Sequence, residues 1–121
     1  MSYALVVDDE DSILELMTAM LESLGWETTA VRSGAQAMAA VEKSVPAFVI
    51  TDMIMPDMEG VEIIRHLRKL HRDLPVIVMS GNPVGTQFLN SARVLGARAT
   101  LSKPFSRSEL EAAVSQVVAN P

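Results

Sequence analysis

Five short apolar segments recur along the chain and alternate with longer segments of helical period. The short segments are rich in Val, Ile and Leu, which predicts β-strands, at residues 3–7, 27–31, 47–51, 76–79 and 98–101. The first, third and fourth are continuously apolar, as expected for strands covered on both faces of a sheet. The pattern therefore predicts a sheet with a buried centre.

The segments between the strands carry apolar residues at spacings of three and four, which predicts amphipathic helices. Two of the five helices are expected over residues 60–71 and 85–95. In the first helix the positions expected to face inward are Ile13, Leu16, Met17, Met20, Leu21 and Leu24, and in the second they are Ala35, Met38 and Val41. In the helix at 60–71 they are Val61, Ile64, Leu67 and Leu70. In the fifth helix they are Leu110, Ala113, Val114, Val117 and Val118.

Local signals mark where several helices begin and end. Ser33 with Gln36, and Ser106 with Glu109, have the spacing of a capping box, in which each side chain binds the other residue's backbone N–H. The apolar stripe of the first helix ends before Gly25, and the helix predicted over residues 85–95 ends at Gly96, as a helix C-terminus often does.

Strict alternation of strands and helices is typical of stacked βαβ units around a parallel sheet. We therefore predict an α/β fold, a single doubly wound (βα)5 domain over residues 1–121, with five parallel strands and helices on both faces. In such sheets, functional groups gather beyond the carboxyl ends of the strands. The search for a site therefore starts there.

Composition narrows the classes of function. The net charge of −5 and the lack of any cluster of Lys and Arg argue against direct binding of nucleic acid. The absence of Cys excludes disulfides and thiol chemistry. No basic leader and no apolar segment long enough to cross a bilayer is present, so no membrane contact and a cytoplasmic location are expected.

Polar residues follow four of the five predicted strands. They are Asp8 and Asp9, Asp52, Ser80 and Gly81, and Lys103. Each alone has an ordinary explanation, since an Asp before a helix caps it, a Ser-Gly forms a turn and a Lys-Pro lies in a loop. Their joint occurrence at one edge is harder to explain in this way, because three carboxylates brought together repel each other unless a cation lies among them.

Magnesium suits such a site, because Mg²⁺ prefers a few carboxylate oxygens together with water and phosphate; Mn²⁺ is the alternative cation. Lys103 adds a fixed positive charge and Ser80 adds a hydroxyl donor, as a transferring phosphoryl group requires. A carboxylate can form an acyl phosphate when metal and positioning assist. Asp52 is therefore the predicted nucleophile.

Four motifs in this order resemble those of the receiver domain of bacterial two-component response regulators. They are VVDDE after the first strand, TDMIMPDMEG after the third, VMSG after the fourth and SKPF after the fifth. The resemblance covers essentially the whole chain. It implies a chemotaxis-type, flavodoxin-like fold with strand order 2-1-3-4-5.

The resemblance also implies a role for each site residue. Asp52 would accept a phosphoryl group from a histidine kinase or a small donor. Asp9, Asp52 and the backbone carbonyl of Ile54 would bind Mg²⁺ directly, and Asp8 would act through water. Ser80 and the backbone of Gly81 would bind the phosphoryl group and Lys103 would pair with it. The Lys103–Pro104 peptide bond would be cis.

The resemblance further implies partners and an output. A sensor histidine kinase or phosphotransfer protein would lie upstream, and a protein target, or an effector domain missing from this chain, would lie downstream. The output face would be the fourth helix, fifth strand and fifth helix. Thr100 stands where the family usually has an aromatic residue, so output is expected to depend on residues 81–85 and the fourth helix instead.

Two other functions are compatible with parts of the pattern. A Mg²⁺-dependent phosphatase with an aspartyl phosphate would need a general acid two residues after the nucleophile, where Ile54 stands. A receiver-like interaction module that takes no phosphate would have lost its acids or its lysine, and this chain keeps all of them. The favoured expectation is a phosphoacceptor, with no enzymatic activity beyond reaction with small donors and loss of its own phosphate.

Overall fold

The computed structural model describes residues 3–53, 60–81 and 96–118. The helices and strands in these ranges are β1 (Tyr3–Val7), α1 (Asp11–Ser23), β2 (Glu27–Val31), α2 (Gly34–Lys43), β3 (Phe48–Asp52), α3 (Gly60–Leu70), β4 (Val76–Ser80), β5 (Ala99–Ser102) and α5 (Arg107–Val117). The helix predicted over residues 85–95 lies outside the described residues.

The five strands form one parallel sheet in the order β2-β1-β3-β4-β5. This confirms the predicted fold class and the strand order that the resemblance implied. β1 and β3 lie at the centre of the described sheet, and every residue from Ala4 to Val7 is fully buried. The continuous apolar pattern of these strands reflects their cover on two faces.

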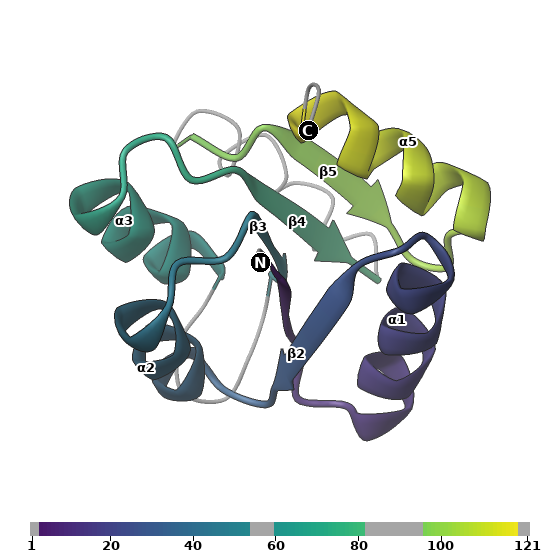
Figure 1. Ribbon diagram of the computed structural model, residues 1–121, viewed down its shortest axis with the longest axis horizontal. Helices are drawn as coiled ribbons and strands as arrows, with labels where there is room; N and C mark the ends of the chain where they lie inside the picture. The colour runs from purple at the N-terminus through teal and green to yellow at the C-terminus, as the bar shows by residue number, and fades with distance from the viewer. Residues whose placement is uncertain (1–2, 54–59, 82–95, 119–121) are drawn as a thin grey trace.

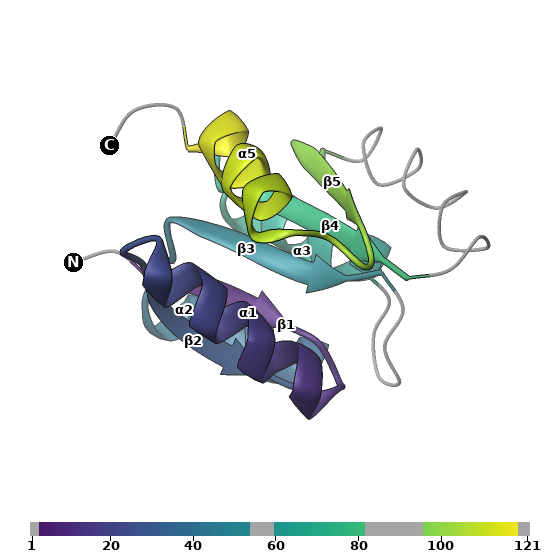
Figure 2. The same ribbon diagram turned by 90° about the vertical axis from the view of Figure 1, so that its right-hand side faces the viewer.

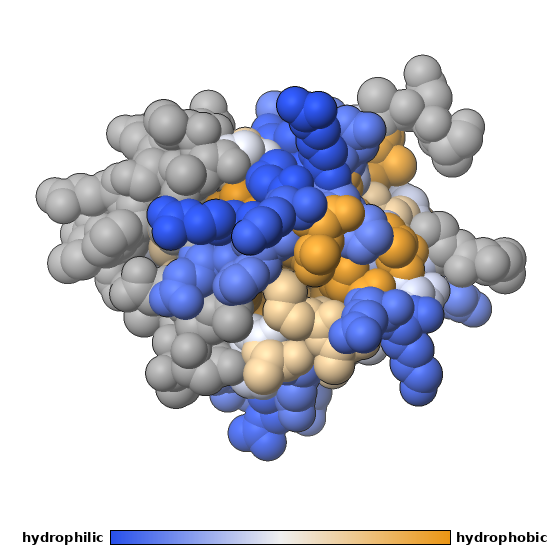
Figure 3. Space-filling view, turned by 90° about the vertical axis from the view of Figure 1, so that its left-hand side faces the viewer, coloured by the Kyte–Doolittle hydropathy of each residue, from blue (hydrophilic) through white to orange (hydrophobic). Residues whose placement is uncertain are grey.

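Helices cover both faces of the sheet (Figures 1 and 2). One core layer packs the sheet against α2 and α3, with Val41, Ile64 and Leu67 among its buried residues. The other packs the sheet against α1 and α5, with Met17 and Leu110 among its buried residues. Seen from the side of α2 and α3, the surface mixes hydrophilic and hydrophobic residues (Figure 3).

The helix faces differ in part from those predicted. Leu16 and Leu70, expected inside, are 49% and 64% exposed. In α1 Met17 and Leu21 are buried as predicted, and the third buried residue is Leu14. Ala35 is also exposed, because α2 turns Ala37 and Val41 toward the sheet. The α5 prediction is confirmed at Leu110, Ala113, Val114 and Val117, and Val118 is partly buried.

The predicted helix starts are confirmed, with one difference in detail. In α5 the Ser106 hydroxyl accepts from the Glu109 N–H at 3.1 Å and the Glu109 carboxylate accepts from the Ser106 N–H at 3.0 Å, a full capping box. In α2 Ser33 likewise accepts from the Gln36 N–H, but the Gln36 side chain accepts from the N–H of Arg32, one residue earlier. Both serines therefore satisfy an N–H that the helix itself leaves unpaired.

Candidate functional site

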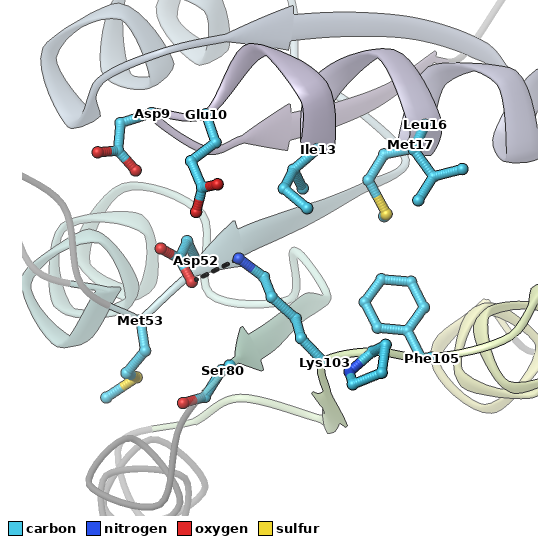
Figure 4. Close-up of a pocket in the computed structure, with 12 residues that line it drawn as sticks. Asp9, Glu10, Ile13, Leu16, Met17, Asp52, Met53, Ser80, Lys103 and Phe105 are labelled. Carbon is cyan, nitrogen blue, oxygen red and sulfur yellow. Dashed lines mark ion pairs between the residues drawn. The ribbon is translucent and has the colours of Figure 1, made fainter.

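The predicted polar residues meet at the carboxyl edge of the sheet. Asp8 follows β1, Asp52 ends β3, Ser80 ends β4 and Lys103 follows β5. A cavity of about 630 Å³ opens among them (Figure 4). Its lining residues are Asp9, Glu10, Ile13, Leu16, Met17, Asp52, Met53, Ser80, Gly81, Lys103, Pro104 and Phe105.

Lys103 joins two of the carboxylates. Its ammonium group lies 2.9 Å from the Oδ2 atom of Asp8 and 3.2 Å from the Oδ1 atom of Asp52. The backbone N–H of Lys103 donates to the Ser80 carbonyl at 2.7 Å, which continues the pairing of β5 with β4 beyond the strand end. The peptide bond from Lys103 to Pro104 is cis, as the resemblance implied.

Asp8 is completely buried and has a partner for each oxygen. Oδ2 accepts from Lys103, and Oδ1 accepts from the backbone N–H of Glu10 at 2.9 Å. A buried carboxylate is tolerated only when its charge is paired and its oxygens are hydrogen-bonded. Asp8 therefore holds Lys103 in place while itself facing away from solvent.

Burial and pairing act in opposite directions on Asp52 and Lys103. Burial raises the pKa of Asp52, and the charge of Asp8 raises it further, so that together they outweigh the opposing effects of Lys103 and of the Met53 N–H. Burial lowers the pKa of Lys103, but its hydrogen bond to Asp8 and the charges of both carboxylates outweigh this effect, and its pKa is raised. Lys103 is thus firmly cationic, whereas ionised Asp52 lacks full compensation.

Three carboxylates lie close enough to share a cation. Asp8, Asp9 and Asp52 each offer one oxygen, and these oxygens lie within 4.8 Å of one another. Such oxygens are the ligands that Mg²⁺ prefers. Asp9 and Asp52 line the cavity and Asp8 does not, so Asp9 and Asp52 are the two better placed to bind a metal there directly. Ile54, whose carbonyl was the third expected ligand, lies outside the described residues.

Ser80 and Gly81 also line the cavity, on the wall formed by the end of β4. Ser80 is 6% exposed. A Cβ atom at position 81 would lie 3.3 Å from the Cδ atom of Lys103. Glycine at this position therefore leaves room for the lysine side chain to reach across to Asp52.

Sequence reasoning missed the apolar part of the cavity. The sequence predicts that Ile13, Leu16 and Met17 lie in the core stripe of the first helix, and it predicts only a cis peptide bond for Pro104. The signal was present, because the stripe of apolar residues is wider than one helix face can bury. Leu14, which is next to this part of the helix in sequence, is 7% exposed and belongs to the core.

Comparison with known proteins agrees with the fold. The response regulator receiver domain model matches residues 4–115. Sporulation initiation phosphotransferase F of Bacillus subtilis is 30% identical over 112 residues, which cover 93% of this chain and 90% of that protein. The chain therefore belongs to the response regulator receiver domain family. Receiver domains are phosphoacceptors that bind Mg²⁺ at an acidic pocket, and they are not enzymes in the usual sense.

Other relatives are longer than this chain, and solved structures of receiver domains superpose on nearly its whole length. DNA-binding response regulator MtrA of Mycolicibacterium smegmatis is 33% identical over 110 residues, which cover 91% of this chain. The chain spans about half the length of such regulators, 47% in this case. The receiver domain of NtrX from Brucella abortus has a TM-score of 0.92 at 28% identity and covers 98% of this chain and 99% of that one. Within the described residues, no helix is long and apolar enough to span a membrane.

Proposed function

We propose that this chain is a phosphoacceptor in a histidine–aspartate phosphorelay and that Asp52 receives the phosphoryl group. The observation that carries the proposal is the position of Asp52. Its carboxylate borders the cavity, 3.2 Å from the ammonium group of Lys103 and close to two further acids. An acid so placed can attack phosphorus while neighbouring positive charge offsets the charge on the phosphoryl oxygens.

The residues present fit a magnesium ion. In the proposed site Asp9, Asp52 and the Ile54 carbonyl bind Mg²⁺ directly, and Asp8 contributes through water. The close approach of three carboxylates supports this assignment, since without a cation they repel each other. When bound, the ion would supply positive charge to the phosphoryl oxygens.

The remaining roles fall to the chain's own side chains. Lys103 neutralises part of the phosphoryl charge, and its contact with buried Asp8 fixes its direction. The Ser80 hydroxyl and the backbone of Gly81 donate to the phosphoryl oxygens from the wall formed by the end of β4. Preorganised donors of this kind stabilise developing charge without reorganising during the reaction.

The upstream partner in this proposal is a sensor histidine kinase or a phosphotransfer protein, encountered in the cytoplasm. The downstream partner is a protein target or an effector domain, bound through the face that includes β5 and α5. The relatives support both, because one is named a phosphotransferase and others are named transcriptional regulators. Thr100 lies on β5 opposite Val78 of β4, so the output face carries no aromatic side chain at that position.

Intact mass after incubation with acetyl phosphate tests the proposal. With Mg²⁺ the protein should gain one phosphoryl group, and without Mg²⁺ it should gain almost none. The gain should disappear in Asp52→Asn and persist in Asp73→Asn, a matched change at an exposed loop residue. A phosphoryl group that still attaches to Asp52→Asn would show that another residue is the acceptor.

A further inference from the structure

β2 forms one edge of the sheet and pairs, within the described residues, only with β1. Figure 1 shows it with α2 on one side and α1 on the other. Backbone groups alternate along a strand, so each residue directs its N–H and C=O either toward the neighbouring strand or away from it. The Val31 carbonyl accepts from the Asp8 N–H at 3.1 Å, which directs Val31 toward β1. The N–H and C=O groups of Thr28 and Ala30 therefore point out of the sheet.

This outward edge is limited to two residues by hydrogen bonds at both of its ends. The Trp26 N–H, just before β2, donates to the Leu21 carbonyl at 3.0 Å. The Arg32 N–H, just after β2, donates to a glutamine side chain of α2 at 2.8 Å. Thr28 and Ala30 together offer two donors and two acceptors for which the described part of the chain supplies no partner. Strand edges of this kind are templates for pairing with another strand.

A cavity borders this edge and leaves room for a strand to approach. It has a volume of about 630 Å³ and lies where β2 meets the C-terminal parts of α1 and α2. Among the residues that line it are Glu27, Thr28 and Thr29 of β2, Glu22 of α1, and Ala40 and Lys43 of α2. Thr29 and Ala30 are exposed. The outer edge of β2 is therefore open to a second strand.

We propose that the outer edge of β2 pairs with the same edge of a second copy of this chain, in antiparallel orientation about a two-fold axis. Thr28 of one copy lies opposite Ala30 of the other, and the two Thr29 residues face each other on the axis. Each of the two pairs of Thr28 with Ala30 exchanges two hydrogen bonds. Every outward N–H and C=O of both copies then has a partner, so the edge is self-complementary, as a two-fold interface requires.

Other registers lack this match. A slip of the paired strands in one direction places Thr28 opposite Arg32, and a slip in the other direction places Ala30 opposite Trp26. The N–H groups of Arg32 and Trp26 are already bonded within their own copy. The register with Thr28 opposite Ala30 is therefore the one in which all outward groups pair.

The charges along β2 favour the same orientation. Glu27 begins the strand and Arg32 follows its end, so antiparallel copies bring opposite charges together at each end of the paired strands. A parallel arrangement brings like charges together. Opposite charges across two strands stabilise their pairing, and like charges oppose it. β2 contributes no residue to the lining of the cavity around Asp52, so the proposal is independent of the phosphoacceptor role.

Sedimentation equilibrium of the full chain, from micromolar to millimolar concentration, tests the proposal. One pair of strands makes a small interface and each copy carries a net charge of −5, so we expect weak and reversible association. The average mass should rise with concentration from the 13.1 kDa of one chain toward twice that value. Over the same range the amide protons of Thr28 and Ala30 should become protected from hydrogen exchange, because the dimer alone bonds them.

Two variants and a matched control locate the interface. Ala30→Pro removes an outward donor and leaves every bond to β1 in place, a position where an edge strand tolerates proline. Each dimer loses two hydrogen bonds, so the dissociation constant should rise about tenfold or more. Thr29→Lys keeps every backbone group and should also weaken association, because it places two like charges on the axis. Ser115→Lys makes the same change of charge at an exposed residue of α5 and should have no effect.

Three outcomes would overturn the β2 pairing. The first is a chain that stays monomeric at millimolar concentration. The second is association that Ala30→Pro and Thr29→Lys leave unchanged, because the interface would then lie elsewhere. The third is an equal loss of association in Ser115→Lys, which would attribute the effect to charge alone. Asp52→Asn should associate as the unchanged protein does, so a failure of this proposal is distinguishable from a failure of the phosphoacceptor role.

Discussion

The ammonium group of Lys103 contacts two carboxylates that differ in their exposure. The side chain of Asp8 is completely buried, whereas that of Asp52 is 14% exposed and borders the cavity. Asp8 has a second donor in the Glu10 N–H, so its charge is well compensated. Asp52 has less compensation for its burial and lies close to a like charge, which raises its pKa. Asp52, the residue proposed to react, is thus the one whose ionised form destabilises the folded protein.

This cost predicts that Asp52→Asn stabilises the metal-free protein at neutral pH. The raised pKa means that the folded protein binds the Asp52 proton more tightly than the unfolded chain does. The contribution of this group to stability is therefore lost as pH rises through its folded pKa. Urea unfolding in EDTA should show a higher midpoint for Asp52→Asn than for the unchanged protein at pH 7, and the difference should shrink as pH falls toward 4.

Glu15→Gln is the control for that measurement, because Glu15 is exposed on α1 and its substitution removes one negative charge away from the cavity. An equal rise in midpoint for Glu15→Gln would attribute the effect to net charge. An Asp52→Asn protein that is less stable at pH 7 would show that the ion pair with Lys103 outweighs burial.

At the scale of elements, serine caps fix where two helices begin. Ser106 of α5 takes part in a complete capping box, and Ser33 of α2 accepts one N–H without the reciprocal bond. The start of α5 also sets the position of the segment that carries Lys103 and Phe105 into the cavity. Arg107 ties this start to α1, since its Nε–H donates to the Ser23 hydroxyl at 2.8 Å.

Ser106→Ala should lower the free energy of unfolding by about 1 kcal/mol, because an N–H of the first turn of α5 loses its acceptor. Ser33→Ala should cost a similar amount, which makes it the matched comparison. Only Ser106→Ala should also slow phosphorylation by acetyl phosphate, since only α5 adjoins the Lys103 segment. Chemical denaturation and intact-mass kinetics on both variants check this. Equal phosphorylation rates in the two variants would show that the α5 cap does not influence the site.

The bounds of the strands could be predicted closely from the sequence, but the side of each helix that is buried could be predicted less well. Strand bounds at residues 3–7 and 27–31 agree with the structure. The first segment is an apolar run, which has few alternatives to a buried strand. The second, ETTAV, is largely exposed at the edge of the sheet. In α1, however, Ile13, Leu14, Leu16 and Met17 are all apolar. Periodicity cannot choose between Leu14 and Leu16 when both flank Met17, and only the position of the sheet decides that Leu14 is buried.

At the scale of the whole molecule, the site depends on contacts that no local pattern contains. The carboxyl ends of parallel strands meet at one edge, so the gathering of Asp8, Asp52 and Lys103 could be predicted. The ion pair that joins Asp8 to Lys103 spans 95 residues of sequence, and its partners could not be chosen before the strand order was known. The apolar wall was missed for the same reason, since Leu16 and Phe105 come from opposite ends of the chain.

Metal binding should couple this site to the stability of the whole domain. A ligand that binds only the folded protein stabilises it in proportion to the logarithm of its concentration, by about 2.7 kcal/mol at 100 times its dissociation constant. Mg²⁺ should therefore raise the unfolding midpoint, because it relieves the repulsion among Asp8, Asp9 and Asp52. Asp9→Asn, which removes a proposed direct ligand, should shift this dependence to at least about tenfold higher Mg²⁺. Asp73→Asn, at the other end of the sheet, should leave it unchanged. If Asp9→Asn responds to Mg²⁺ as the unchanged protein does, the cation binds elsewhere and the carboxylates are compensated by Lys103 alone.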